Sequence, residues 1–282
     1  MCEFCHKHGE GQRWYLRAEN YSEDLLGDLR RRRFIQSFFS SPQHLIEGEG
    51  KLGRLNQLPS FVRSVVTPIA VNRQKKSHYG QVVPIEEVER IFAFVNSVVR
   101  LPCICRQATV GSEQRYCYGV SMVAQEESQL ARMVREIDAS YLTGPDTAGL
   151  EALSKQEALA SLRDLEKNGL CHTVWTLVTP FIGGICNCDR SDCMAMRATI
   201  AMGFPVMFRA EYAAEVNPEL CNGCRHCMRA CQFGAMGYSI AHEKVAIDPR
   251  RCYGCGICRA GCTKNAIVLA ERSSVPLAQS VW

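Results

Sequence analysis

The sequence predicts an α+β fold in three structural parts and a tail, and two patterns in its 282 residues support this organisation. Apolar residues recur at helical spacing through the first half and lead into a helix–turn–strand pattern. Near the C-terminus, a group of cysteines is duplicated. We therefore expect a largely helical N-terminal segment at 1–80, a cysteine-bearing α/β domain at 81–210, a compact duplicated domain at 211–272 and a tail at 273–282.

The apolar spacing places the helices of the first half. One helix is expected over residues 21–39, whereas residues 40–80 resemble loop and short helix. The apolar residues of 85–99 predict another helix, which stops before Pro102 because the residue preceding a proline disfavours the α conformation. A third amphipathic helix is expected over about 126–141.

A helix–turn–strand unit follows in the sequence. Residues 154–157 form a Ser-x-x-Glu capping box, and Asn168-Gly169 is a favoured helix stop. The alternating stretch 170–178 then predicts a strand. This order resembles a winged-helix-like unit, but the basic residues of the helix are balanced by acidic ones. A nucleic-acid reader needs a basic face, so we interpret the unit as scaffold and expect no nucleic-acid partner.

Two cysteine ladders with identical spacing are the most informative feature of the chain. Cys221 opens a C-x2-C-x2-C-x3-C run, and the same run begins again at Cys252, 31 residues later. One such ladder could arise by chance among 17 cysteines, but two in register are hard to explain without iron–sulfur clusters. The alternative is a pair of zinc sites with four thiolates each.

The ladders resemble the bacterial two-cluster ferredoxin domain, in which three cysteines of one ladder and the fourth of the other hold each [4Fe–4S] cube. This assigns a first ferredoxin quartet of Cys221, Cys224, Cys227 and Cys262, and a second ferredoxin quartet of Cys252, Cys255, Cys258 and Cys231. The proline that usually follows the fourth cysteine is replaced by Gln232 and by Thr263. Because that proline supplies no ligand, we expect altered local solvation and retained clusters.

Six more cysteines form two compact groups upstream of the ladders. These middle cysteines are Cys103, Cys105, Cys117, Cys186, Cys188 and Cys193. In an extended segment, residues two apart point the same way and lie about 6–7 Å apart, which suits thiolates on different irons of one cube. We expect a third metal centre, an iron–sulfur cluster held by four or more of them. A zinc site and free thiols are the alternatives.

Three runs in this region resemble a family of cysteine-rich 4Fe-4S binding proteins from anaerobic microbes. The runs are 102–106, 166–172 and 184–188, and the resemblance covers 85–270. Members of that family join such a front part to a two-cluster ferredoxin domain. The resemblance implies an electron-transfer subunit or accessory protein of a larger oxidoreductase in anaerobic metabolism, without fixing a substrate.

The N-terminus carries a further group of ligand-type residues, Cys2, Cys5, His6 and His8. The C-x-x-C-H order matches c-type haem attachment, but that requires export and the chain opens with no secretory signal. A small metal site is the alternative, and an unliganded terminus is the simplest interpretation.

Composition favours a cytoplasmic location. No apolar run reaches the ~20 residues that span a bilayer, and cysteine groups in a reducing compartment usually indicate metal or catalysis. The formal net charge of +4 does not call for nucleic acid.

We expect an electron-transfer protein that uses two [4Fe–4S] clusters and a third cluster, and that docks on a larger redox enzyme. The chain has no Gly-rich dinucleotide fingerprint and no P-loop. A second hypothesis is a reductase whose catalytic centre is the middle cluster. A third is a redox-sensing regulator, against which the missing basic face argues.

Overall fold

A seven-stranded sheet forms the centre of the protein in the computed structural model, which describes residues 12–142 and 149–281. The strand order is β4-β2-β3-β6-β5-β1-β7, and every pair is antiparallel except β1 with β7. Its strands are β1 (Gly80–Val82), β2 (Ser97–Leu101), β3 (Cys117–Ser121), β4 (Glu151–Leu153), β5 (Cys171–Thr176), β6 (Ile182–Cys188) and β7 (Met207–Phe208). Helices and strands are mixed throughout, so the α+β prediction is confirmed.

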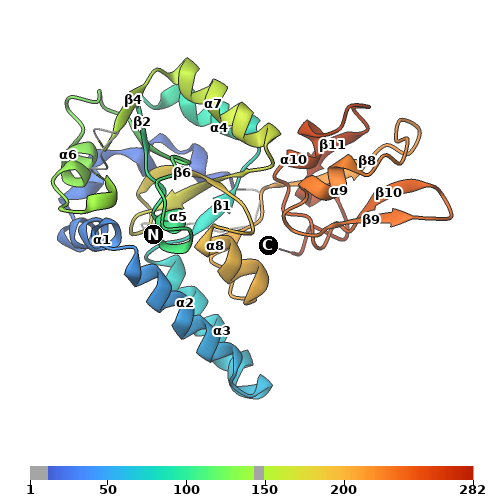
Figure 1. The fold of residues 1–282 in the computed structure, drawn as a ribbon, viewed down its shortest axis with the longest axis horizontal. Coiled ribbons are helices and arrows are strands. Elements are labelled where there is room, and N and C mark those ends of the chain that lie inside the picture. Colours follow the sequence, from blue (N-terminus) through green and yellow to red (C-terminus); the bar gives the residue numbers. More distant parts are fainter. Residues whose placement is uncertain (1–11, 143–148, 282) are drawn as a thin grey trace.

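Helices cover both faces of this sheet (Figure 1). On one face lie α4 (Ile85–Phe94) and α7 (Lys155–Lys167), whose Ser161 shares a hydrogen bond with the Tyr118 hydroxyl of β3. Because side chains alternate along a strand, Cys117 beside Tyr118 points to the opposite face. That second face is covered by the short helices α5 (Ile104–Thr109) and α8 (Met194–Met196), the latter continuing into a π-helical turn.

The N-terminal part differs from the prediction for residues 21–39. Short 3-10 turns fill residues 14–27, and the first α-helix, α1, runs Leu29–Ser40. Its start is fixed by Asp28, whose carboxylate accepts a hydrogen bond of 2.8 Å from the Arg30 amide, so the expected start at 21 is wrong.

Residues 40–80 contain two long helices, which the sequence prediction of loop and short helix missed. They are α2 (Gln43–Asn56) and α3 (Ser60–Lys75), and they form a hairpin that projects from the body (Figure 1). The glycines of α2 and Pro68 inside α3 lower the intrinsic helix propensity of this region. Both helices are largely exposed, because α2 has no buried residue and α3 has only Val71.

Two further helix predictions were too long. The helix expected over 85–99 ends at Phe94, because Val98 and Val99 pair with β3 and β4 as part of strand β2. The helix expected over 126–141 is α6 (Gln129–Arg135), which Ser128 caps by accepting a hydrogen bond from the Ala131 amide.

The helix–turn–strand unit is present where it was predicted. The capping box of Ser154 and Glu157 forms with both of its hydrogen bonds, and α7 ends before Gly169 at φ +86°. The following strand, β5, is an inner strand of the seven-stranded sheet, so this unit is built into the larger domain.

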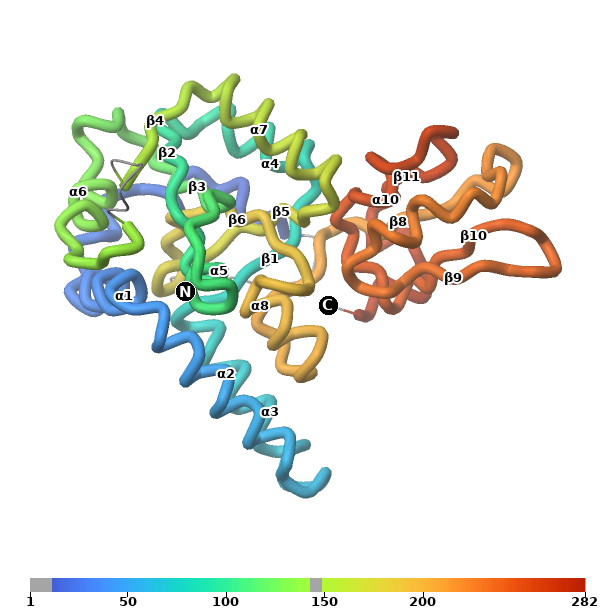
Figure 2. Tube along the Cα trace, in the orientation of Figure 1, coloured from blue at the N-terminus to red at the C-terminus, as the bar shows by residue number. Residues whose placement is uncertain are grey.

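The C-terminal part consists of two similar halves beside the sheet domain (Figure 2). Its strand pairs are β8 (Tyr212–Val216) with β11 (Ile267–Glu271) and β9 (Met236–Ser239) with β10 (Lys244–Ile247). Each half carries one short helix, α9 (His226–Ala230) or α10 (Ile257–Ala260). The tail packs back on this part, because Val275 and Ala278 share a small core with Ala213. Among the described residues, no helix has both the length and the apolarity to cross a bilayer.

Candidate metal centres

Three neighbouring strands place cysteines on one face of the sheet. The register sets Cys117 of β3 opposite Cys186 of β6, and Cys188 of β6 opposite Cys171 of β5. Directly paired residues share a face, and so do residues two apart on one strand. All four thiols therefore lie on the face turned away from α7, and the Thr173 hydroxyl on the same face lies 3.4 Å from the Cys188 sulfur.

Two short helices bring the remaining middle cysteines to that face. Cys103 caps the N-terminus of α5, Cys105 lies in its first turn, and Cys193 caps α8. The Cys103 backbone amide donates to the Gln114 carbonyl at 2.7 Å, which ties the start of α5 to the segment that leads into β3. The N-terminal ends of α5 and α8 and the pairing of β3 with β6 therefore bring the six middle cysteines to the same place.

All six middle cysteines form an unbroken chain of side-chain contacts. In order along this chain they are Cys186, Cys117, Cys103, Cys105, Cys193 and Cys188. The sulfur–sulfur distance is 3.6 Å at one end, between Cys186 and Cys117, and 3.2 Å at the other, between Cys193 and Cys188. The sequence could group these residues only by type, and the fold brings every one of them together.

A cavity of about 520 Å³ lies against this cysteine group, and all six middle cysteines line it. Glycine at 183 and 184 keeps the β6 side of the cavity free of bulky side chains, while Trp175, Leu52 and Phe204 contribute apolar wall. Cys103, Cys188 and Cys193 are buried, whereas Cys105, Cys117 and Cys186 are half-buried. The site therefore has room for an inorganic core larger than a single ion.

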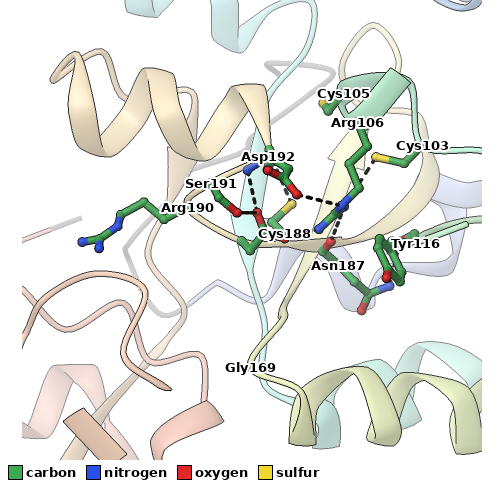
Figure 3. A network of polar contacts seen from close by, with 12 residues as sticks. Cys103, Cys105, Arg106, Tyr116, Gly169, Asn187, Cys188, Arg190, Ser191 and Asp192 are labelled. Atoms are coloured by element: carbon green, nitrogen blue, oxygen red, sulfur yellow. Dashed lines mark hydrogen bonds and ion pairs between the residues drawn. The ribbon is translucent and has the colours of Figure 1, made fainter. Parts of the chain in front are cut away.

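Arg106 places a buried positive charge beside the thiols (Figure 3). Its guanidinium donates to the Cys103 sulfur at 3.7 Å and to the Asn187 carbonyl at 3.2 Å, and it pairs with Asp189. Its central carbon also lies 4.2 Å from the ring centroid of Tyr116. Burial would lower the pKa of Arg106, but the negative charges of Cys103 and Asp189 outweigh it and raise that pKa. The arginine stays charged and offsets negative charge at the cysteines.

The thiols themselves influence one another strongly. Hydrogen bonds from Cys105 and Cys117, helped by the Arg106 charge, lower the pKa of Cys103 against the effect of burial. The same contacts together with burial raise the pKa values of Cys105 and Cys117. Thiolates, and not thiols, bind metal, so the Arg106 charge beside Cys103 favours the form of that residue that binds a metal.

The donor set fits an iron–sulfur cluster. It consists of thiols alone, in a largely apolar surrounding with one compensating cation, which are the features of cluster sites. In residues 12–142 and 149–281, no three His, Cys, Asp or Glu side chains are arranged around a single metal ion. The two ferredoxin quartets share this property, as expected for ligands that bind separate irons of a cluster.

The cysteines of the two C-terminal ladders lie close to one another. Cys227 interacts electrostatically with the other members of the first ferredoxin quartet, and burial together with these neighbours raises the pKa of Cys227 to about 11. Cys258 interacts with the other members of the second ferredoxin quartet and with Cys227, so the two quartets are adjacent. The chain thus brings each fourth cysteine to the other half.

The two halves repeat their backbone geometry around these cysteines. Gly223 and Gly254 have φ of +70° and +69°, and a Cβ at these positions would lie 2.3 Å and 2.1 Å from a backbone oxygen. Backbone amides also point at equivalent sulfurs. The amides of Ala235 and Ala266 lie 3.3 Å and 3.4 Å from the sulfurs of the ladder cysteines four residues before them. Such amide–sulfur bonds stabilise negative charge on a cluster.

Two parts of the sequence prediction have a different outcome. Cys2, Cys5, His6 and His8 lie outside the described residues. Cys171 was not considered as a site residue, yet it is fully buried between the middle cysteines and Cys255. Its signal was available, because it belongs to the alternating stretch that became strand β5.

Residues 220–267 match the family model of the 4Fe-4S dicluster domain, as the ladders predicted. This part covers both quartets. No curated protein matches the chain at the threshold applied.

Proposed function

We propose that this protein carries single electrons through two [4Fe–4S] clusters in its C-terminal part and a third iron–sulfur cluster at the middle cysteines, to or from a larger oxidoreductase. The dicluster match supports the first two clusters. The two ferredoxin quartets would hold them, and clusters of this kind supply one-electron transfer.

The convergence of the six middle cysteines carries the proposal for the third cluster. They come from two strands and two helix N-termini, and random placement would not join them into one chain of contacts. Four thiolates suffice for a cube, so the group has two sulfurs to spare. Arg106 would balance part of the negative charge of a thiolate-bound cluster.

The test is the content of iron, acid-labile sulfide and zinc in protein purified without oxygen. Two cubes give about eight irons, and a third gives about twelve. Each middle cysteine is then replaced singly by alanine, with Cys171→Ala as the matched buried control outside the contact chain. The six variants include Cys186→Ala. We expect at least four of the six to lose about four irons each, and Cys171→Ala to keep all of its irons. About eight irons in the unsubstituted protein, with or without one zinc, would refute the third cluster, and about twelve irons retained in all six variants would refute its placement at the middle cysteines.

A second candidate function is a reductase with its catalytic centre at the middle cysteines, and the cavity favours it. The cavity of about 520 Å³ at the middle cysteines lies within the size range of small-molecule sites. This candidate predicts that a small electron acceptor changes the electron paramagnetic resonance (EPR) signal of the middle cluster. The matched control is a variant with a larger side chain at Ala198, which lines the cavity and lies outside the cysteine group. This variant should abolish the change in the EPR signal and keep the iron.

A further inference from the structure

We propose that the second ferredoxin quartet is the neighbour that exchanges electrons with the middle cysteines, and that Cys171 and Gln232 are the positioning residues that hold the two sites together. This order rests on the proposed third cluster. It leaves the first ferredoxin quartet as the outer site.

The first observation is a direct contact between the two domains at cysteine side chains. Cys171 of β5 is fully buried, and its thiol contacts Cys255, a member of the second ferredoxin quartet. On its other side, Cys171 pairs across the sheet with Cys188, one of the middle cysteines. A single side chain thus touches one quartet and stands beside the middle group.

The packing around this contact is continuous. Cys171, Cys188 and Cys193 share one buried apolar core with Cys255 and Ile257 of the C-terminal part. A second core inside the C-terminal part contains Cys221 and Cys227 of the first quartet together with Cys252 and Cys258 of the second, so Cys255 is the buried quartet member that joins the sheet-domain core. No water-filled gap needs to be crossed between the second quartet and the sheet domain.

Gln232 ties the same two sites together by hydrogen bonds. Its side-chain amide donates to the Gly169 carbonyl at 2.8 Å, two residues before Cys171. Its side-chain oxygen accepts from the Arg190 amide at 3.0 Å, in the loop between Cys188 and Cys193. Gln232 directly follows Cys231, a second-quartet cysteine, in place of the usual proline. Gln232, which replaces the usual proline, therefore connects the two domains by hydrogen bonds, whereas its sequence position led us to expect only altered local solvation.

The repeat shows that these contacts are specific to the second ferredoxin quartet, which contains both Cys255 and Cys231, the residue before Gln232. The residue equivalent to Cys255 is Cys224, which is exposed, and the residue equivalent to Gln232 is Thr263, also exposed. Where the first half has Arg225 stacked on Tyr238, the second has Gly256 at φ +85° beside Glu166 of α7.

An ion pair at 2.5 Å between Arg259 of α10 and Glu86 of α4 adds to this interface. Figure 2 shows the end of α7 beside α10. Both contacts involve the half that holds Cys255.

The transfer itself makes and breaks no bond. A one-electron donor protein reaches the first quartet at its exposed Cys224, and one electron then passes through the second quartet to the group at the middle cysteines, or the reverse. Cys171 keeps its proton and acts through position alone.

The experiment uses matched positions of the repeat in the full chain. Cys258→Ser and Cys227→Ser are equivalent buried substitutions that each remove one cube. In partly reduced protein, EPR measures the magnetic interaction of the middle cluster with its neighbour. We expect Cys258→Ser to abolish this interaction and Cys227→Ser to retain it, whereas the opposite pattern would overturn the order.

A second pair keeps the test informative if these variants do not fold. Gln232→Ala should weaken the magnetic interaction and slow electron equilibration between the two domains several-fold at unchanged iron content, and Thr263→Ala should change neither. Cys171→Ala should act like Gln232→Ala, with Cys171→Ser closer to wild type. Equal behaviour of Gln232→Ala and Thr263→Ala would overturn the positioning role. A protein with eight irons and no middle signal would instead refute the proposed function itself, which iron analysis detects separately.

Discussion

The guanidinium of Arg106 lies 3.7 Å from the sulfur of Cys103, and both side chains are buried. A buried charge so close to a ligand acts on its electrostatics with little screening by solvent. Since Cys103 begins α5 and Arg106 lies three residues later, one helical turn fixes this distance.

Arg106→Met should therefore lower the reduction potential of the third cluster that we propose at the middle cysteines. Removing the positive charge makes the added electron less favourable, by on the order of 50 mV, or about 1 kcal/mol for a one-electron couple. A redox titration followed by EPR measures the shift. Arg163→Met is the control, because Arg163 pairs with Glu89 at the surface. A potential that moves upward, or moves equally in the control, would contradict the prediction.

Cys224→Ala should remove one C-terminal cube and stop electron transfer even if the rest of the chain folds. We expect a loss of about four irons, since the cube needs a thiolate on each iron. Because Cys224 is exposed, its replacement leaves the buried packing intact. Iron analysis and circular dichroism check the two statements together. Retention of all irons would place the ligand elsewhere.

Gly254→Ala should destabilise the second ferredoxin quartet. The new Cβ would lie 2.1 Å from the Tyr212 carbonyl oxygen, and φ is +69°, where L-residues cost about 1–2 kcal/mol even without a clash. We expect a loss of at least about 2 kcal/mol in unfolding free energy and faster release of iron on urea treatment. Gly237→Ala is the control, because a Cβ there meets no atom within 4 Å. Equal effects of the two substitutions would rule out this explanation.

Stability should fall as the pH drops from about 6.5 towards 4, in part through His78. Burial lowers the pKa of His78 to about 4, although its ring nitrogen bonds to the Thr176 carbonyl at 2.5 Å. In the unfolded chain a histidine has a pKa of about 6.5, so only the unfolded state gains a proton in this range. The contribution of His78 is present above pH 6.5, and about 1.4 kcal/mol of it is lost by pH 5.5.

Urea unfolding at pH 7.5 and 5.5, followed by circular dichroism, measures this effect. His78→Phe preserves an aromatic ring beside Trp175 and should reduce the pH dependence by about 1.4 kcal/mol. His44→Phe changes an exposed histidine and should leave the dependence as it is. An unchanged pH dependence in His78→Phe would show that His78 does not titrate between the two states.

The sequence predicted the C-terminal part well because its information is local. The spacing that starts at Cys221 and Cys252 states both the ligand type and the turn geometry, and the positive φ of Gly223 and Gly254 agrees with it. The capping box at Ser154 is local in the same way.

The remaining elements depended on contacts distant in sequence. Val98 and Val99 fit a helix by spacing, and only pairing with β3 and β4 makes them a strand. The helices α2 and α3 contain glycines and a proline, which lower the helix propensity of this region. The grouping of Cys117 with Cys186 required the strand register, which no spacing along the chain encodes.

The two ends of a duplicated domain are similar, so an approaching molecule could bind either end. In this chain Gln232 of the first half and Cys255 of the second half, which both lie at the second ferredoxin quartet, attach that quartet to the sheet domain, whereas Cys224 of the first quartet is exposed. The two ends of the duplicated domain therefore differ, because one contacts the sheet domain and the other faces solvent. As a result, the loop around Thr263 should tolerate substitutions, whereas the equivalent loop around Gln232 should be constrained by its contacts with the sheet domain.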